Sequence, residues 1–487
     1  MHARPVGLTS RALVIALVVS ALSMLSWTVE PPLAPAAKGQ PAPSAVAAPP
    51  GAPHVFFYNL DDLRDALPGQ VDPLSFMPKA KAWMADGRRY TQTTVGVPSC
   101  CPSRAALMTG RYPHNNGVLR QSQGPLFDGA HSLACYLQAG GYTTYIAGKF
   151  LTTWPRTTVP PCYTHSTVMW GGYTDVAVRV DGVSQTASGY STTYLGNRGR
   201  SYITAALDAG QTFYLYEPPQ APHWVQVTRP DGVQDRLAVP EPTYASAPVG
   251  SCAGPPEADR SDKPAYVRRT NETTADAQLM CESQLRAIMS ADDQFDATMR
   301  LLQSRGVLDN TLVILSSDNG YNWGEHGRTE KFVPYEPSIR VPLLVRWPGH
   351  IPAGVDTSRV VSYLDIMPTV LQAAGFVLPA SAPRLDGESL LAASSRTTGY
   401  SEYHLDTDNG NVNTWKAART RSWKYIETHN ESGGVVFREY YNLTSDPHEA
   451  NNLLVDPYPN TPPATQLSRA QTLLGQLSSC SGSGCIR

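Results

Sequence analysis

Short apolar runs alternate along the chain with longer segments that have helical spacing. The runs HVFFYNLDDLR, QTFYLYEPPQAPHW and NTLVILSSDNG predict buried strands that end in acids, prolines or amides. HSLACYLQAGGYTTYIAGKF predicts a helix that ends at Gly140 and Gly141, followed by a strand that ends near Lys149. SQLRAIMSADDQFDATMRLLQSRG has near-helical spacing and a terminal Gly306. Strands that alternate with helices predict an α/β fold with a large, mostly parallel central sheet flanked by helices.

Polar side chains gather where these predicted strands end. In doubly wound sheets, ligands bind beyond the carboxyl ends of the strands. The residues at such ends are Asp61, Asp62, Lys149, His223, Asp318 and Asn319. These six residues are therefore the first candidates for a functional site.

The alternation of helices and strands weakens towards the C-terminus. Beyond residue 375, short strand-like segments such as KYIETHN and VVFREYYNL predict a small antiparallel sheet. We therefore expect a main domain at residues 54–375 and a C-terminal subdomain at residues 376–487.

The first 53 residues do not have the pattern of a folded domain. Arg4 and Arg11 form a basic front, and residues 12–27 are an apolar run too short for a comfortable membrane span. We interpret residues 1–30 as a cleaved secretory signal peptide rather than a retained anchor. The Pro/Ala-rich residues 31–53 are interpreted as a flexible linker. The mature protein is then predicted to be secreted, with the membrane involved only in export.

Charge excludes one large class of partners. The 487 residues have a formal net charge of -2, and 16% of them are charged, so there is no basic footprint for nucleic acid. An anionic substrate must instead be bound by a few local lysines and arginines.

Export would permit disulfides among the eight cysteines. Cys480 and Cys485 are separated by a Gly/Ser-rich spacer that can close a small loop, so we expect a disulfide between them. The pairing of the other cysteines is left open.

The segment VPSCCPSRAALMTGRYPHNNGV contains two adjacent cysteines, Cys100 and Cys101. A disulfide between neighbours would strain the intervening peptide, and no second pair at zinc-ligand spacing follows. The run from Cys100 through Pro102, Ser103 and Arg104 to a T-G pair matches C-x-P-S-R, the signature of the sulfatases. The sequence therefore resembles a type I sulfatase of the formylglycine class, which implies an alkaline-phosphatase-like fold and hydrolysis of sulfate esters.

The resemblance implies that Cys100 is oxidised by a separate formylglycine-generating enzyme, which recognises Cys100, Pro102 and Arg104. The resulting aldehyde (3-oxoalanine) hydrates to a diol, and Cys101 only fills a variable position. A diol forms a sulfated hemiacetal, which collapses to the aldehyde and expels sulfate. Covalent catalysis thus divides one difficult step into two easier ones.

The resemblance also assigns metal ligands. Asp61, Asp62, Asp318 and Asn319 match the family's ligands, completed by an oxygen of the modified residue at position 100. Because every donor is a hard oxygen, calcium is the expected ion, with magnesium as the alternative.

Several cationic residues match the family's substrate contacts. Lys149 resembles the lysine that contacts the diol, and His223 resembles the histidine that binds sulfate or protonates the leaving oxygen. Lys331, in KFVPYE, should bind a sulfate oxygen, and Arg104 should orient the diol and support the charge of the site. His326 and Trp224 are weaker candidates for substrate contact, and a structural role for His326 is equally consistent with the sequence.

The expected substrate follows from a departure within the family. Many members carry K-x-H where this chain has Lys149-Phe150-Leu151, so that histidine base is absent from its usual place. The glucosamine-6-sulfatase branch also has leucine there and shares CCPSR, DNGY and VPLLVR. We therefore expect a secreted hydrolase of glycosaminoglycan-type sulfated amino sugars. The alternatives are an arylsulfatase or phosphonate monoester hydrolase, and an inactive secreted glycan-binding protein.

Overall fold

The computed structural model describes residues 48–487, except residue 230, residues 408–410 and residues 456–461. The predicted signal peptide at residues 1–30 and most of the predicted linker at residues 31–53 lie outside the described residues. Within the described part, no helix is both long and apolar enough to cross a membrane.

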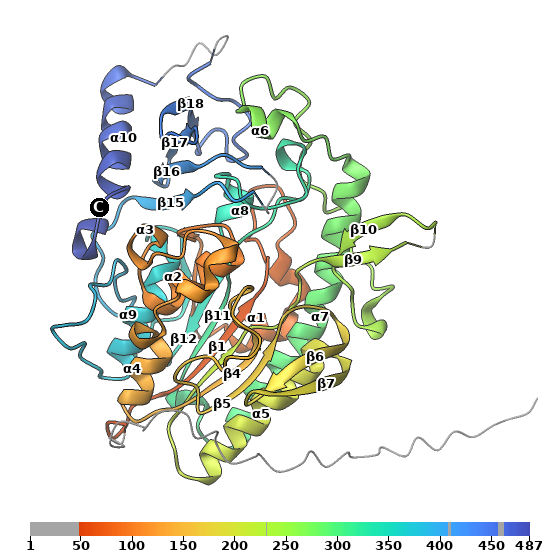
Figure 1. The fold of residues 1–487 in the computed structure, drawn as a ribbon, viewed down its shortest axis with the longest axis vertical. Coiled ribbons are helices and arrows are strands. Elements are labelled where there is room, and N and C mark those ends of the chain that lie inside the picture. The colour runs from red at the N-terminus through yellow and green to blue at the C-terminus, as the bar shows by residue number, and fades with distance from the viewer. Residues whose placement is uncertain (1–47, 230, 408–410, 456–461) are drawn as a thin grey trace, which may run out of the picture. The chain divides into compact units, whose positions relative to one another are not determined.

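A ten-stranded sheet forms the centre of the described fold (Figure 1). Its strands are β1 His54–Leu60, β2 Arg88–Tyr90, β4 Thr143–Lys149, β5 His165–Met169, β6 Thr174–Val180, β7 Val183–Tyr190, β8 Phe213–Glu217, β11 Thr311–Ser317, β12 Leu343–Arg346 and β13 Gly354–Asp356. The neighbours β11, β1, β8, β4 and β5 run parallel. Antiparallel strands extend this core, with β12 beside β11 and β6 beside β5. The prediction of a large, mostly parallel sheet is confirmed.

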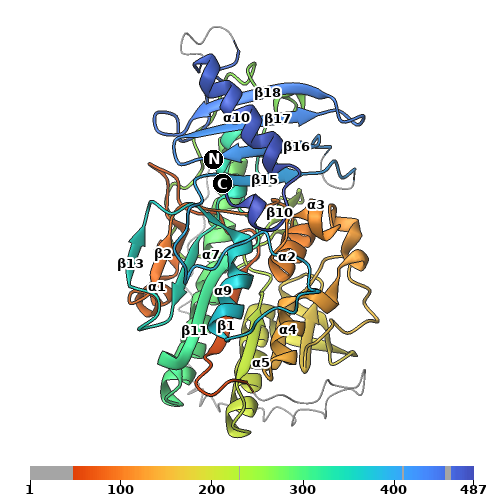
Figure 2. The ribbon, with the colours of Figure 1, turned by 90° about the vertical axis from the view of Figure 1, so that its left-hand side faces the viewer.

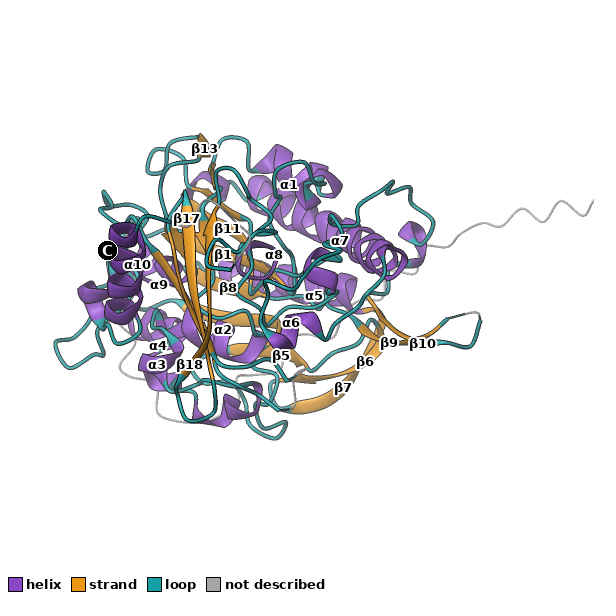
Figure 3. Cartoon of the chain, turned by 90° about the horizontal axis from the view of Figure 1, so that it is seen from above, coloured by secondary structure: helices purple, strands orange, loops and turns teal. Residues whose placement is uncertain are grey.

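Helices cover both faces of the central sheet (Figure 3). On one face α7, Thr274–Ser304, contacts both α1, Pro78–Trp83, and α5, Ser191–Asp208. On the other face α2, Cys100–Thr109, contacts α4, Leu133–Ala139, and α9, Ile366–Ala373. The short helices in the connecting segments are α3 Pro113–Asn116, α6 Ala265–Arg268 and α8 Glu336–Ile339. Because β1 lies between these two layers, all seven of its residues are buried.

Residues after 375 form a second, four-stranded antiparallel sheet, as the sequence predicts. Its strands are β15 Gly399–Tyr403, β16 Trp415–Arg419, β17 Trp423–His429 and β18 Val435–Asn442. Helix α10, Ala464–Leu477, packs across β16 and β17 (Figure 2).

The two sheets are joined by buried contacts rather than separated by a linker. Trp415 Nε1 donates a hydrogen bond to the Phe332 carbonyl oxygen at 2.8 Å, and Tyr403, Trp415 and Ile426 belong to the same apolar core as β1. The domain boundary near residue 375 therefore stays a prediction, since the apolar core continues across it.

Two small sheets and three disulfides complete the described fold. β3, Thr93–Thr94, pairs with β14, Val361–Ser362, and β9, Val225–Thr228, forms a separate hairpin with β10, Gln234–Leu237. The disulfides are Cys135–Cys162, Cys252–Cys281 and Cys480–Cys485. The last is the pair expected from its short spacer, and the first two are pairings that the sequence left open.

Candidate active site at the carboxyl edge of the central sheet

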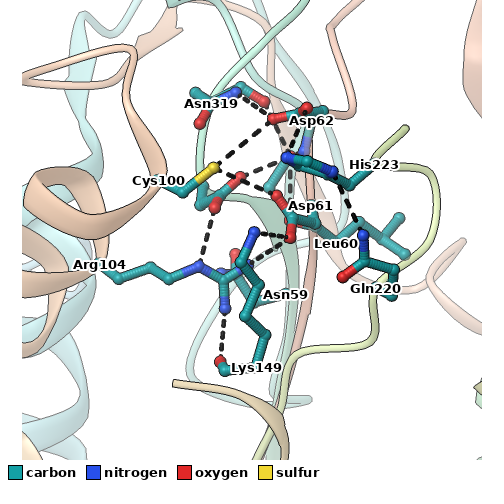
Figure 4. A network of polar contacts seen from close by, with 12 residues as sticks. Asn59, Leu60, Asp61, Asp62, Cys100, Arg104, Lys149, Gln220, His223 and Asn319 are labelled. Carbon is teal, nitrogen blue, oxygen red and sulfur yellow. Dashed lines mark hydrogen bonds and ion pairs between the residues drawn. The ribbon is translucent and has the colours of Figure 1, made fainter. Parts of the chain in front are cut away.

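The register of the parallel strands brings the predicted strand-end residues together. Leu60 at the end of β1 lies opposite Ser317 at the end of β11, so the residues that follow these strands meet beyond the same edge. Direct contacts among the residues confirm this, and Figure 4 shows most of them. All six strand-end residues lie in one cluster: Asp61, Asp62, Lys149, His223, Asp318 and Asn319.

Helix α2 places Cys100 in this cluster and Cys101 outside it. Cys100 is the first residue of α2, and its Sγ lies 3.5 Å from Asp61 Oδ1 and 3.9 Å from Asp62 Oδ1. Cys101 packs in the apolar core, with its Sγ 4.0 Å from Thr153 Oγ1. The start of a helix carries a partial positive charge, which favours an anion beside Cys100.

Two lysines neutralise the aspartates next to Cys100. Lys149 Nζ lies 2.5 Å from Asp61 Oδ2. Lys331 Nζ donates to Asp62 Oδ1 and lies 2.7 Å from Cys100 Sγ. Burial disfavours the charged amine of Lys331, but Asp62 and the other anionic groups raise its pKa well above the usual range. Both amines are therefore charged at neutral pH.

Arg104 links two strand ends and does not hydrogen-bond Cys100. Its Nε donates to Asp318 Oδ2 at 2.8 Å, and its Nη1 donates to the Lys149 carbonyl oxygen at 2.6 Å. Its Nη2 lies 3.4 Å from Asp61 Oδ2. Arg104 therefore places a positive charge between Asp61 and Asp318 and joins their strand ends to the end of β4.

Burial and charge act in opposite directions on the acidic groups. Burial favours the neutral form of Asp61, but Lys149, with His223, Arg104 and Lys331, holds its pKa well below the usual range. Burial, together with Asp61, raises the pKa of Asp318. Burial also raises the pKa of the Cys100 thiol, although Lys149 and Lys331 oppose this shift. An unmodified Cys100 is therefore a protonated thiol and a weak nucleophile.

The oxygen atoms of the cluster fit a hard divalent cation. Ligand atoms of Asp61, Asp62, Cys100 and His223 lie within 4.8 Å of one another. Asp62 Oδ2 and Asn319 Oδ1 are buried without a hydrogen-bond partner, which is costly unless a cation satisfies them. This group contains His223 in addition to predicted ligands, and a hard cation would favour the oxygens over the imidazole and the sulfur.

His223 lies at the open side of the cluster and has a partner that the sequence reasoning missed. Its Nε2 is 3.7 Å from Asp62 Oδ2, and its Nδ1 is 2.6 Å from the Trp224 carbonyl oxygen. Nδ1 is also 3.2 Å from the side-chain amide of Gln220. Burial and then the charge of Lys149 lower the pKa of His223 to about 4. The only signal for Gln220 in the sequence was its position three residues before His223.

The two weaker candidates for substrate contact have different surroundings. The Trp224 ring stacks on His223, with 5.3 Å between ring centroids, and lies under the guanidinium of Arg236. His326 Nδ1 lies 2.7 Å from Glu257 Oε2, and its ring packs on Tyr335. In the described part of the chain, no hydrogen bond or ion pair joins His326 to the Cys100 cluster, so the structure does not bring this candidate to the site.

Comparison with known proteins gives two matching families. The family Sulfatase matches residues 53–376, and the family N-sulphoglucosamine sulphohydrolase, C-terminal, matches residues 324–470. An arylsulfatase of Chlamydomonas reinhardtii is 31% identical over 494 residues, which cover 87% of this chain and 74% of the relative. The N-acetylglucosamine-6-sulfatase of Homo sapiens is 27% identical over 497 residues, covering 90% of this chain and 87% of the relative.

One solved structure has a similar fold over most of its length. It is a protein in complex with its substrate D-glucosamine-2-N,6-O-disulfate, and it matches with a TM-score of 0.72 at 20% identity. The match covers 88% of this chain and 97% of that structure.

Proposed function

Because the chain belongs to the sulfatase family and is a sulfuric ester hydrolase, we propose that it removes sulfate from 6-O-sulfated N-acetylglucosamine. The reaction uses a formylglycine made from Cys100 and a divalent cation, with calcium expected. The observation that carries the proposal is the position of Cys100, as the first residue of α2, between two aspartates and beside Lys331.

Residues of the chain provide the electrostatic setting for attack on a sulfate ester. The hydrated aldehyde would supply the attacking oxygen at position 100, and the cation would shield the sulfate oxygens and lower the pKa of that oxygen. Asp61, Asp62, Asp318 and Asn319 would hold the cation. Lys149 and Lys331 would stabilise the negative charge of the transferring group, because their amines already lie against the aspartates in a buried setting.

His223 is proposed as the acid that protonates the leaving oxygen of the sugar. Its Nε2 points towards Asp62, while its Nδ1 lies beside the Trp224 carbonyl oxygen. Since a carbonyl oxygen only accepts, this 2.6 Å contact favours the tautomer with the proton on Nδ1. The 3.2 Å contact of Nδ1 with the Gln220 amide then requires that amide to turn its oxygen, which has no hydrogen-bond partner, towards the ring. Nε2 then faces the reacting groups. Because the pKa of His223 is about 4 in the free site, His223 would gain its proton when the anionic sulfate ester binds beside it and would pass that proton to the leaving oxygen.

The names of the relatives support the sugar substrate but leave a second candidate. A relative named N-acetylglucosamine-6-sulfatase spans most of the chain, and the shared leucine after Lys149 and Phe150 agrees with that branch. The arylsulfatase relative favours the alternative of a small aryl sulfate as substrate. A phosphonate monoester presents similar oxygens, so the cationic residues alone do not separate the two esters. An inactive glycan-binding protein would have no need for the cysteine, the lysines and the aspartates together.

We also propose that the protein is exported and has a catalytic domain at residues 54–375 and a subdomain at residues 376–487. Three disulfides among the described cysteines support export, because such bonds persist in oxidising compartments.

The test is a substrate panel on protein produced together with a formylglycine-generating enzyme. Sulfate release is measured from N-acetylglucosamine 6-sulfate and nitrophenyl sulfate, and nitrophenol release from a phosphonate monoester. The mass of the tryptic peptide that contains position 100 reports conversion of the cysteine. A higher kcat/KM on the sugar than on the aryl sulfate is expected. Conversion with turnover of only the aryl or phosphonate ester would contradict the sugar proposal.

A further inference from the structure

A cavity of about 420 Å³ lies between the β9–β10 hairpin, the start of α7 and the segment before Lys331. This volume is within the range of small-molecule pockets. We call it the hairpin cavity. Its lining includes Gln226, Arg236, Glu272, Tyr321 and Glu330.

The hairpin cavity adjoins the open side of the Cys100 cluster. Glu330 lines the cavity, and the next residue, Lys331, contacts Cys100. Arg236 also lines the cavity, and its guanidinium lies 4.7 Å from the ring centroid of Trp224, which stacks on His223. The His223 side chain is 18% exposed, compared with 5% or less for Lys149 and Lys331. The cluster is therefore open on the side of His223, and Trp224 and Arg236 connect that side to the cavity.

Tyr321 forms part of the wall between the cavity and the cluster. Its ring is buried and lines the cavity. The charges that act on its phenol come from Glu330 and Arg236 in the cavity and from Asp62 and Lys331 in the cluster. In the described part of the chain, no residue forms a hydrogen bond with its hydroxyl group. The hydroxyl is not among the buried polar atoms that lack a partner, so it reaches the open space of the cavity and is available to a ligand there.

The cavity lining carries more negative than positive charge. Its ionisable residues are four carboxylates and two guanidinium groups: Asp235, Glu272, Asp276, Glu330, Arg236 and Arg328. Both guanidinium groups lie within 3.8 Å of Glu330. Burial and then the neighbouring carboxylates of Asp276, Glu330 and Asp235 raise the pKa of Glu272. Such a lining repels an anion and accepts hydroxyl groups.

We propose that the hairpin cavity binds the sugar next to the sulfated one and selects a neighbour without a carboxylate or a sulfate. Tyr321 and the amide of Gln226 hydrogen-bond the hydroxyl groups of this neighbour, while the acidic lining disfavours a uronate. This inference rests on the proposed action on 6-O-sulfated N-acetylglucosamine. It narrows the substrate class to glycans in which this residue adjoins a neutral or amino sugar.

The test compares two disaccharides that share a 6-O-sulfated N-acetylglucosamine at the non-reducing end. In one the second sugar is galactose, and in the other it is glucuronic acid; the monosaccharide is the reference. The galactose disaccharide should be favoured by roughly fivefold or more in kcat/KM, mainly through KM, with a smaller ratio at high salt. Glu272→Lys should reduce or reverse this ratio. Glu282→Lys, an equal change of charge on α7 outside the cavity, is the matched control and should preserve it.

Tyr321→Phe provides a second measurement that removes only the hydroxyl group. It should raise KM for the galactose disaccharide more than for nitrophenyl sulfate. Equal kcat/KM on both disaccharides would overturn the inference. The same change of the kcat/KM ratio in Glu272→Lys and Glu282→Lys would also overturn it. In either case, turnover of the monosaccharide would still support the proposed function. Turnover of aryl sulfate alone would overturn both.

Discussion

The Cys100 cluster and a second cluster around Glu336 both bury charged side chains, but they differ in how those charges are satisfied. The Glu336 cluster lies between the central and C-terminal sheets and consists of Glu336, Arg340, Arg419, Lys424 and Glu449. Each carboxylate oxygen of Glu336 and Glu449 has a cationic nitrogen or a backbone N–H within 2.9 Å. Glu449 Oε1 has no hydrogen bond, but it lies 2.6 Å from Lys424 Nζ. In the Cys100 cluster, Asp62 Oδ2 and Asn319 Oδ1 have no hydrogen-bond partner, and the ring nitrogen His223 Nε2 is 3.7 Å from Asp62 Oδ2.

This difference shows which property distinguishes a reactive site from a structural one. Buried charge alone occurs in both clusters, so it does not identify the site. Glu336 also begins a helix, α8, and Glu449 Oε1 also lacks a hydrogen bond. Of this pair, only the Cys100 cluster combines these features with a partly exposed histidine, His223. Changes in the Cys100 cluster should therefore reduce activity, and changes in the Glu336 cluster should reduce stability.

The largest effect is expected at Cys100. Cys100→Ala removes the precursor of the nucleophile and should lower kcat by at least about 1,000-fold, since covalent catalysis is lost. Thermal unfolding should shift little, because the side chain serves chemistry rather than packing. Cys101→Ser is the matched control and should keep most of the activity. The opposite result for the two variants would show that the motif is assigned to the wrong cysteine.

Removal of the cation should have the next largest effect. Exhaustive chelation should reduce activity by orders of magnitude, and added calcium should restore it. Asp61→Ala should have a similar effect that calcium does not restore. Asp293→Ala, a change at a surface carboxylate that pairs with Lys79, should leave activity unchanged. Metal analysis of the chelated protein distinguishes a tightly held ion from a site that needs none.

Glu336→Gln should reduce stability and leave activity nearly unchanged, the opposite of the changes in the Cys100 cluster. Loss of this charge leaves Arg419 buried without a carboxylate partner and leaves Lys424 with Glu449 alone, which should lower the free energy of unfolding by about 3–5 kcal/mol. The kcat of the folded protein should stay near the wild-type value. Chemical denaturation and assays below the unfolding transition measure the two quantities. A large loss of kcat without a loss of stability would mean that the two clusters are functionally coupled.

A pH-dependent effect is expected at Glu439, which lies near the second cluster and accepts hydrogen bonds from Tyr335 and Tyr441. Burial raises its pKa to about 7. The folded state holds the Glu439 proton more tightly than the unfolded state does. The contribution of Glu439 to the free energy of unfolding is therefore complete below about pH 4.5 and is lost as the pH rises to 7. Relative to Glu439→Gln, the wild type should lose roughly 3 kcal/mol over this window. If the curves of unfolding free energy against pH were parallel for the wild type and Glu439→Gln, the raised pKa of Glu439 would be contradicted.

The smallest effect is expected at Gln220, which contacts His223. Gln220→Ala should reduce kcat on a sugar sulfate by about tenfold and affect nitrophenyl sulfate less, because a good leaving group needs little protonation. Gln220→Glu should recover part of the loss. An equal loss on both substrates would indicate a purely structural role.

The sequence predicted those site residues whose position in the fold follows from the strand that they directly follow in the chain. Asp61 and Asp318 each follow an apolar run, and parallel strands place such residues at one edge whatever their distance along the chain. The small C-terminal sheet was also predictable, since KYIETHN and VVFREYYNL fall on β17 and β18.

Contacts between distant segments could not be predicted. Glu336 and Arg419 are separated by 83 residues, and neither has a local pattern that identifies its partner. The pairing of Cys252 with Cys281 depends on how a loop packs on α7. His326 shows the same limit, because its contact with Glu257 depends on a segment 69 residues away.

The β9–β10 hairpin has a consequence for how new substrate preferences could arise. It pairs only with itself and contributes no strand to the central sheet, yet Gln226 and Arg236 on it line the hairpin cavity. Its residues can therefore be exchanged, in evolution or by grafting, without disturbing the strand ends that carry Asp61, Asp318 and Lys149. Substitutions in the hairpin could thus change which substrates are accepted while the catalytic residues stay the same.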